Sequence, residues 1–322
     1  NGGLAVNNLL RLIGRRLVAL PIMVVGVSFL VFSIMWLSPV DPAYSALGES
    51  ATPQALEAYR AQHGLNDPFF IQYGRYLWNM IHGDLGTYGA SSSSVTDLVS
   101  KALPLTLQLT FLGLFIAVLI SFPLGVLAAL YRDRWPDQII RVFSVIGIGT
   151  PSFWLAALLV LAFLHSPLKV SGEVPALTVN PTGWFLRMLL PAIALAVPVI
   201  GQMTRVVRTS MVEELDRDYV RTAVGAGIPK SIVVARNVLR NALITPVTVL
   251  GLRVGYLMGG AVVIEIIFSI NGMGKAVLLK GIQENWVTLV QGGALVVAIA
   301  FIIVNIIVDV LYLLINPRIR SV

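Results

Sequence analysis

One stretch of this sequence resembles a nucleotide-binding loop, Asn271–Ala276, which reads NGMGKA. A phosphate-binding loop of the form GxxxxGK[ST] cradles phosphates on its backbone amides, and its final hydroxyl residue binds Mg²⁺. Here Ser269 stands where the first glycine is needed, and Ala276 replaces the hydroxyl residue. The segment lacks both features, so we expect that the chain does not bind ATP through it.

Histidine and cysteine offer no second route to chemistry. The three histidines, His63, His82 and His165, lack the spacing of metal ligands, and the chain contains no cysteine. Disulfides, thiol catalysis and cysteine-based metal sites are therefore excluded. No catalytic triad or pair of carboxylates can be argued from these positions. We expect a non-catalytic chain with no cofactor and no bound metal.

Three ionisable residues, Arg253, Glu265 and Asp309, lie inside long apolar stretches, where a charge is costly and is therefore a candidate for function. Glu265 follows Arg253 by about 18 Å along a helix, which is too far for a direct pair. Arg253 and Asp309 both lie toward the same end of their stretches. They either form an ion pair between two helices or extend separately to the membrane surface.

Glycine recurs at every fourth position in one of these stretches, at Gly251, Gly255 and Gly259. In a helix this spacing places all three on one face, which allows another helix to approach closely in lipid. The face serves either packing within the chain or an interface between subunits.

The composition indicates that these apolar stretches lie in a membrane. Of the 322 residues 57% are hydrophobic and 12% are charged, with a mean hydropathy of +0.83. A soluble chain of this size needs far more surface charge. A run of about 20 apolar residues crosses a bilayer as a helix. The sequence therefore predicts an all-α integral membrane protein, and its net charge of +7 is better explained by membrane topology than by nucleic-acid binding.

Six spans are predicted, with both termini in the cytoplasm. Roughly two-thirds of the 23 Lys and Arg residues fall on the side assigned to the cytoplasm, as the positive-inside rule requires. The predicted spans are residues 17–37, 103–130, 138–164, 184–203, 243–268 and 287–315, within a transmembrane domain of residues 17–315. The cytoplasmic parts are the N-terminal segment 1–16, a loop at 205–242 and the tail 316–322. The longest outer segment is 40–101, and residues 270–286 form another outer loop.

The loop at 205–242 departs most from its apolar surroundings. It carries Arg221, Lys230, Arg236 and Arg240 between two spans. Residues 219–224 favour a helix, Gly225 and Gly227 break it, and Pro229 permits a second helical start. A rigid knob of this kind suits docking to a protein, and the alternative is a basic amphipathic loop that lies on anionic lipid.

Several motifs give the chain a family resemblance. Arg221-Thr222-Ala223 followed by Gly227 resembles the EAA signature of bacterial ABC importer permeases, in the form of the dipeptide/oligopeptide (B-type) branch. Further matches to that branch follow in order along the chain: Gly64–Pro68, His82–Gly86, Pro123–Gly125, Pro151–Trp154, Gly259–Ala261 with Glu265, and Asn316–Arg320. The chain departs from the branch at Thr245-Pro246, at Asn271-Gly272 and near Val174–Ala176, which leaves the local geometry there open.

This resemblance implies a type I ABC importer permease in the plasma membrane that passes peptides or a related small solute. Its implied partners are a second homologous permease, cytoplasmic ATPase subunits and an extracytoplasmic substrate-binding protein that the segment 40–101 helps to receive. The implied ATPase-coupling residues are Asp218, Tyr219, Arg221, Thr222, Ala223, Gly225, Ala226, Gly227, Pro229, Arg240 and Asn241. Gly251, Gly255, Gly259 and Glu265 would lie near the translocation path. The alternative is an ion-coupled carrier or channel that uses Arg253, Glu265 and Asp309.

Overall fold

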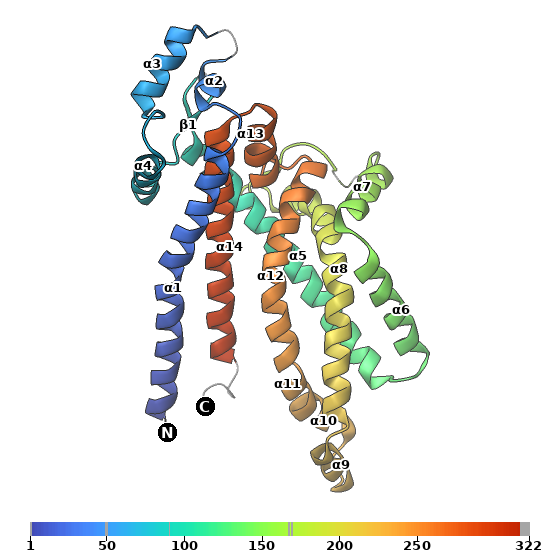
Figure 1. The fold of residues 1–322 in the computed structure, drawn as a ribbon. Coiled ribbons are helices and arrows are strands. Elements are labelled where there is room, and N and C mark those ends of the chain that lie inside the picture. The colour runs from blue at the N-terminus through green and yellow to red at the C-terminus, as the bar shows by residue number, and fades with distance from the viewer. Residues whose placement is uncertain (1, 49–50, 90, 167, 169, 316–322) are drawn as a thin grey trace. The chain divides into compact units, whose positions relative to one another are not determined.

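The computed structural model describes residues 2–48, 51–89, 91–166, 168 and 170–315. The chain divides into two compact units, residues 1–107 with 269–306 and residues 108–268 with 307–322. Two long helices, α5 (Val95–Leu130) and α14 (Val287–Ile315), contribute to both units (Figure 1).

Five helical stretches in the described part of the chain are long and apolar enough to cross a membrane. They are Val18–Trp36, Val95–Leu130, Pro181–Leu215, Ile244–Ile267 and Val287–Val308. The helices α6 (Trp135–Gly149) and α7 (Ser152–Phe163) make a sixth span if this bent pair is counted as one. The predicted all-α membrane fold is confirmed, and the predicted number of six spans depends on the bent pair.

The third predicted span, residues 138–164, is bent near its middle. The axes of α6 and α7 differ by 98°, and the break lies at Thr150-Pro151. Proline lacks a backbone N–H and disfavours the helical conformation of the preceding residue. Thr150 accordingly has φ −87° and ψ 113°, which are extended values.

The N-terminal elements of the first unit are α1 (Gly2–Trp36), α2 (Pro42–Leu47), α3 (Pro53–His63) and α4 (Phe69–Ile81), followed by a two-stranded hairpin of β1 (Thr87–Tyr88) and β2 (Ser93–Ser94). Asp41 caps α2 by accepting from the Ala43 amide at 2.9 Å, and its carboxylate also pairs with Arg60 of α3. Rings of α4, including Tyr73, pack edge-on against Phe29 of α1 at 5.3 Å between centroids. The described part of the segment 40–101 is therefore largely helical.

The segment 270–286, predicted as an outer loop, is largely helical. It contains a π-helix, η2 (Met273–Leu279), and a short helix, α13 (Lys280–Gln283). Met273 and Val277 are fully buried against Val95 and Val99 of α5 and Leu289 of α14. The Met273 amide also donates to Thr106 Oγ1 at 2.9 Å. The short apolar repeat at 273 and 277 was hidden by the flanking glycines and lysines, and burial of this repeat produces the helix.

The second unit is built around α8 (Pro181–Leu215), which packs against α6, α7 and α12 (Ile244–Ile267). Small residues let these helices approach closely. A Cβ on Gly201 of α8 would lie 2.5 Å from the Ser144 carbonyl oxygen of α6, and a Cβ on Gly125 of α5 would lie 2.5 Å from Val207 Cβ. Both glycines are therefore required by helix packing.

Candidate functional site: the segment between α8 and α12

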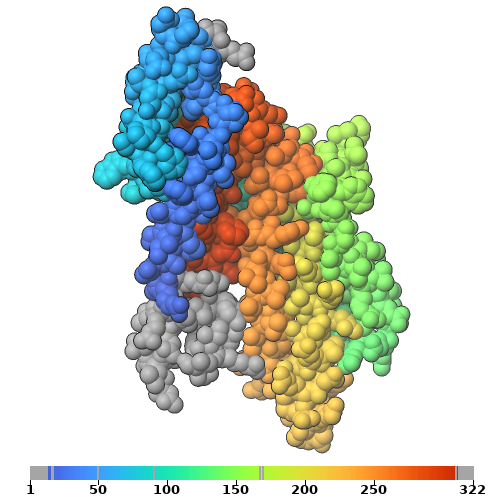
Figure 2. Space-filling view, in the orientation of Figure 1, coloured from blue at the N-terminus to red at the C-terminus, as the bar shows by residue number. Residues whose placement is uncertain are grey.

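The predicted basic loop folds as a compact helical segment, which we call the α9–α11 segment (residues 218–242). It consists of α9 (Asp218–Gly225), α10 (Lys230–Val233), the π-helix η1 (Val234–Val238) and α11 (Leu239–Ala242). In Figure 1 it lies beyond the end of α8, and in Figure 2 it forms a protruding end of its unit. The helix predicted at 219–224 is confirmed and is one residue longer at each end.

The turn after α9 is the glycine elbow that the sequence predicted. The Ile228 amide donates to the Ala223 carbonyl at 3.2 Å, and the Gly227 amide donates to the Val224 carbonyl at 3.0 Å. These two bonds form a Schellman motif, in which the penultimate position takes a left-handed conformation. Gly227 has φ +87°, which a side chain would strain. Gly225 instead ends α9 and has no positive φ, so only the second glycine is needed for the turn.

A buried apolar cluster fixes the α9–α11 segment to the helices behind it. Val220 of α9 and Val233 of α10 are buried against Val207 and Met211 of α8 and Ala129 of α5. Val238 and Ala242 continue the cluster, with Tyr219, Ala223, Leu239 and Leu243 packed against it. The α9–α11 segment is therefore packed directly against α8 and α5.

The outer face of the segment is exposed. Every residue from Val224 to Ile232 is solvent-exposed, including Ala226, Gly227 and Pro229. Val224, Ile228 and Ile232 are 42%, 44% and 51% exposed and recur at every fourth position. Apolar side chains left uncovered on an anchored protrusion mark a candidate interaction surface, for a protein or for the membrane.

Polar contacts brace the start of the segment. Tyr219 Oη donates to Glu214 Oε1 at 3.0 Å, and Arg217 Nε lies 3.2 Å from Glu214 Oε2. Burial raises the pKa of the Tyr219 phenol, and Glu214 acts in the same direction. The phenol therefore stays protonated and keeps donating at neutral pH. Among the remaining predicted coupling residues, Asp218, Arg221, Thr222 and Arg240 are exposed, and Asn241 is half-buried on α11.

A buried ion pair behind the segment was not predicted. Arg208 of α8 donates to both carboxylate oxygens of Asp137 on α6, at 2.6 and 2.7 Å. Asp137 is fully buried and also accepts from the Asp133 amide at 2.9 Å. Such forked pairs are strong and directional. The only sequence signal was a carboxylate just after a basic turn, which did not identify its partner.

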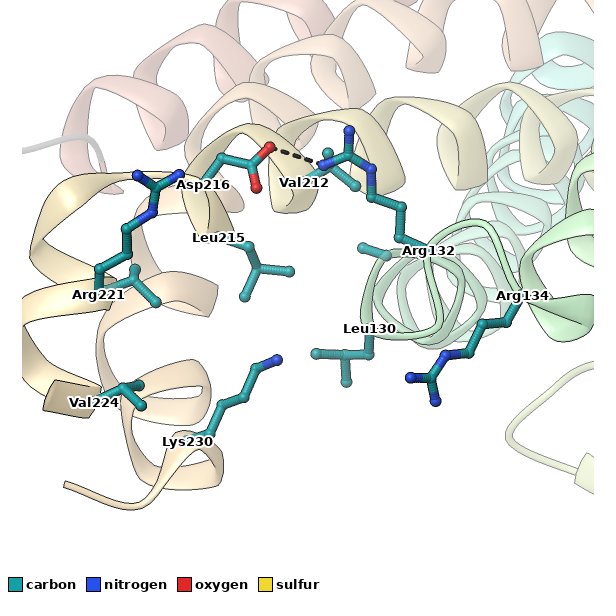
Figure 3. A pocket seen from close by; sticks show the side chains of 11 residues that line it. Leu130, Arg132, Arg134, Val212, Leu215, Asp216, Arg221, Val224 and Lys230 are labelled. Carbon is teal, nitrogen blue, oxygen red and sulfur yellow. Dashed lines mark hydrogen bonds and ion pairs between the residues drawn. The ribbon is translucent and has the colours of Figure 1, made fainter. Parts of the chain in front are cut away.

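A groove opens between the α9–α11 segment and the turn that joins α5 to α6. Its volume is about 700 Å³, and basic side chains line it from both sides (Figure 3). Arg132 contacts Asp216 at 2.8 Å, while Arg134 and Lys230 reach toward the opening from opposite walls. The full lining is Ala129, Leu130, Arg132, Arg134, Val212, Leu215, Asp216, Val220, Arg221, Val224 and Lys230.

Two of the three ionisable residues predicted within the spans lie on α12. Glu265 is fully buried on α12, and Arg253 is half-buried on the same helix. The Asp309 side chain lies outside the described residues, so the proposed pair with Arg253 stays a prediction. A Cβ on Gly251 would meet Val308 of α14 at 2.7 Å, whereas Gly259 is exposed with no described atom within 4 Å of such a Cβ. At Gly251 the glycine face serves packing within the chain.

Comparison with known protein families assigns this chain to a family. Residues 121–321 match the family described as "Binding-protein-dependent transport system inner membrane component", and residues 9–110 match the N-terminal component of the same systems. The chain belongs to this family. The protein is thus a permease, the membrane-spanning subunit of an ABC importer, and the predicted resemblance is confirmed. The ion-coupled alternative is not retained, because the family is ATP-driven.

Named relatives agree with this assignment over nearly the whole permease. A peptide transport system permease of Brucella abortus is 38% identical, over 94% of this chain and 96% of the relative. A D,D-dipeptide transport system permease of Escherichia coli K12 is 38% identical, over 95% and 96%. The glutathione transport system permease of the same strain is 36% identical, over 91% and 94%.

A solved structure supports the fold of the permease. The crystal structure of an amino acid ABC transporter with histidines aligns with a TM-score of 0.51 at 15% identity, over 69% of this chain and 94% of that chain. The predicted type I permease fold is therefore confirmed.

Proposed function

We propose that the permease passes short peptides or a related small solute across the plasma membrane. The support is that its relatives are named for peptide, D,D-dipeptide and glutathione transport, which are all peptide-like solutes. Uptake of a labelled dipeptide by cells that carry the whole transporter, compared with cells that lack this chain, tests the solute class. Uptake that is unchanged by the deletion would contradict it.

We further propose that the α9–α11 segment couples the permease to cytoplasmic ATPase subunits. The observation that carries this proposal is the combination of an exposed tip, from Val224 to Ile232, with a buried anchor at Val220 and Val233. A coupling element must present a surface to the partner and yet move as one body with the spans behind it. In this mechanism, ATP-driven closure of the ATPase subunits displaces the tip and tilts α8 and α5 between inward- and outward-facing states.

The orientation follows from the charge of this segment. Arg221, Lys230, Arg236 and Arg240 favour the cytoplasm, and with the bent pair counted as a sixth span this supports a cytoplasmic location for both termini. We propose that a second homologous permease completes the membrane pore and that the ATPase subunits carry out all hydrolysis. In this chain Met273 and Gly274 of the NGMGKA stretch are buried in η2 instead of forming an open phosphate loop, which supports a non-catalytic role.

The opposite side of the membrane is proposed to receive a substrate-binding protein. The helices α2, α3 and α4 and the β1–β2 hairpin form an ordered layer within residues 40–101. Phe70 and Trp78 of α4 are 76% and 66% exposed, which leaves aromatic surface for contact with a protein or with the bilayer interface.

Cysteine cross-linking tests the coupling proposal directly, because the chain contains no native cysteine. The variant Ala226→Cys places a thiol at the exposed tip, and we expect it to cross-link in membranes to single-cysteine ATPase subunits of the same transporter. The cross-link should change in yield when ATP is added. Ser91→Cys, exposed in the outer segment, is the matched control and should give no such product. A transport-competent Ala226→Cys protein that never cross-links would overturn the docking assignment.

A further inference from the structure

Two grooves meet at Leu130, near the end of α5. One is the basic groove of Figure 3, and the other is an apolar groove of about 430 Å³. Leu130 lines both, so the two grooves are neighbours that share this side chain. The apolar groove is lined by Phe122, Pro123, Val126, Leu127, Leu130, Leu239 and Leu243.

The basic groove has more positive than negative charge. It contains Arg132, Arg134, Arg221 and Lys230 and one carboxylate, Asp216, which is held by Arg132. Within the part of the chain that the structure describes, neither Arg134 nor Lys230 has a carboxylate within 4.0 Å. Cations that face one opening without counter-charges repel each other, and a bound anion removes this repulsion.

The apolar groove continues a face of α5 that is exposed along the span. Phe115 and Leu119 are 62% and 59% exposed, and Phe122, Val126 and Leu130 follow them at helical spacing. This face lies on one of the helices apolar enough to cross the membrane. Lipid chains therefore have direct access to the groove from the bilayer.

We propose that the two grooves together bind one anionic phospholipid. Its phosphate lies between Arg134 and Lys230, and one acyl chain lies along Phe122, Val126 and Leu130. Basic pockets at the ends of membrane helices select anionic headgroups by charge, and the neighbouring apolar wall supplies the contact that a soluble anion cannot use. An acidic peptide would satisfy the cations but would leave the seven-residue apolar lining uncovered.

The location gives this lipid a consequence for the permease. Arg134 belongs to the turn between α5 and α6, whereas Lys230 starts α10 of the α9–α11 segment. Within the described residues, no hydrogen bond or ion pair links the side chains of Arg134 and Lys230 to each other. A phosphate bound by both would connect the α5–α6 turn to the α9–α11 segment. The anionic lipid content of the membrane therefore influences the position of the α9–α11 segment.

The test uses the assembled transporter, purified in a neutral detergent and exposed to phosphatidylglycerol and phosphatidylcholine with identical acyl chains. Native mass spectrometry then counts the lipids that stay bound. We expect phosphatidylglycerol to be retained in preference to phosphatidylcholine. Removing Arg134 and Lys230 as Arg134→Gln and Lys230→Gln should weaken its binding by about 5-fold for each charge. Leu127→Gln, in the apolar groove, should weaken retention without changing the charge.

Arg236→Gln is the matched control, because Arg236 is exposed on η1 and lies outside both grooves. It removes one positive charge and should leave lipid retention unchanged. Equal retention of the two lipids, or full retention by the Arg134/Lys230 double variant, would overturn the proposal. Displacement by glycerol phosphate as readily as by intact lipid would show that a soluble phosphate suffices. If phosphatidylglycerol binds to the isolated permease but not to the assembled transporter, an ATPase subunit occupies the grooves and the proposal is overturned.

Discussion

Arg208 of α8 donates two parallel hydrogen bonds, of 2.6 and 2.7 Å, to the fully buried carboxylate of Asp137 on α6. This pair ties α6 to α8 on the stretch of α8 that also carries Val207 and Met211, the residues against which the α9–α11 segment packs. A rigid connection at this point keeps the proposed coupling surface in register with the bent α6–α7 pair.

Loss of the Asp137 charge should destabilise the permease. Removing one partner of a buried pair leaves the other charge uncompensated. For Asp137→Asn we expect the free energy of unfolding to fall by about 3 kcal/mol, the lower end of the usual cost, because Arg208 retains some exposure to solvent. Chemical unfolding in detergent micelles measures it. Arg217→Gln removes an exposed guanidinium from Glu214, whose carboxylate keeps its hydrogen bond from Tyr219, and should change stability by about 0.5 kcal/mol or less. Equal losses in the two variants would show that the buried pair has no special role.

The elbow after α9 should tolerate a side chain at one glycine and not at the other. Gly227→Ala forces alanine to φ +87°, at a cost of about 1–2 kcal/mol to the turn. Hydrogen exchange of the Ile228 amide, which bonds to the Ala223 carbonyl, should become faster. Gly225→Ala is the control, because its Cβ would meet no described atom within 4 Å and its φ is not positive. Its exchange rate should stay the same or fall, and a rise equal to that of Gly227→Ala would contradict the Schellman assignment.

The close approach of α6 and α8 should be sensitive to one methyl group. In Gly201→Ala the new Cβ would lie 2.5 Å from the backbone oxygen of Ser144, so a helix must move. We expect a loss of about 1–3 kcal/mol, seen as a lower unfolding temperature of the purified permease. Gly149→Ala adds the same methyl where no described atom lies within 4 Å. If Gly201→Ala unfolds at the same temperature as Gly149→Ala, the two helices are not packed as closely as described.

Arg187 should be irreplaceable even by lysine. It is fully buried on α8, where Nε donates to the Gly172 carbonyl at 3.1 Å and Nη2 donates to the Phe268 carbonyl at the end of α12. A lysine has no planar fork to reach both oxygens, so Arg187→Lys should cost about 1–3 kcal/mol and expose the loop near Gly172 to protease. Arg205→Lys, at an exposed position of the same helix, should leave cleavage unchanged. Resistance of Arg187→Lys to protease would mean that the two carbonyls do not depend on this side chain.

The sequence predicted the features that depend on local chemistry. Apolar length marked the spans: five of the six overlap a single long helix, and the third overlaps the bent α6–α7 pair. The elbow was predictable because Gly227 allows a positive φ and the following Ile228-Pro229 disfavours continuation of the helix. The family was also recognisable, because its motifs are short runs along the chain.

What the sequence could not determine depends on partners distant along the chain. Nothing near Arg187 in the sequence identifies its partners, the carbonyls of Gly172 and Phe268, between which it is fully buried. The segment 273–283 was predicted as a loop, yet Val95 and Val99 give its apolar residues a surface on which to fold.

The sequence by itself determined that this chain is a membrane permease with a basic, glycine-broken segment between two spans, because hydropathy and backbone preference are properties of neighbouring residues. Only the tertiary structure decided that Asp137 pairs with Arg208, that Gly201 touches α6, and that Arg134 and Lys230 face one groove. The physical reason is that an ion pair, a close packing contact and a shared electrostatic field each depend on distances between residues far apart in sequence, which the folded chain alone sets.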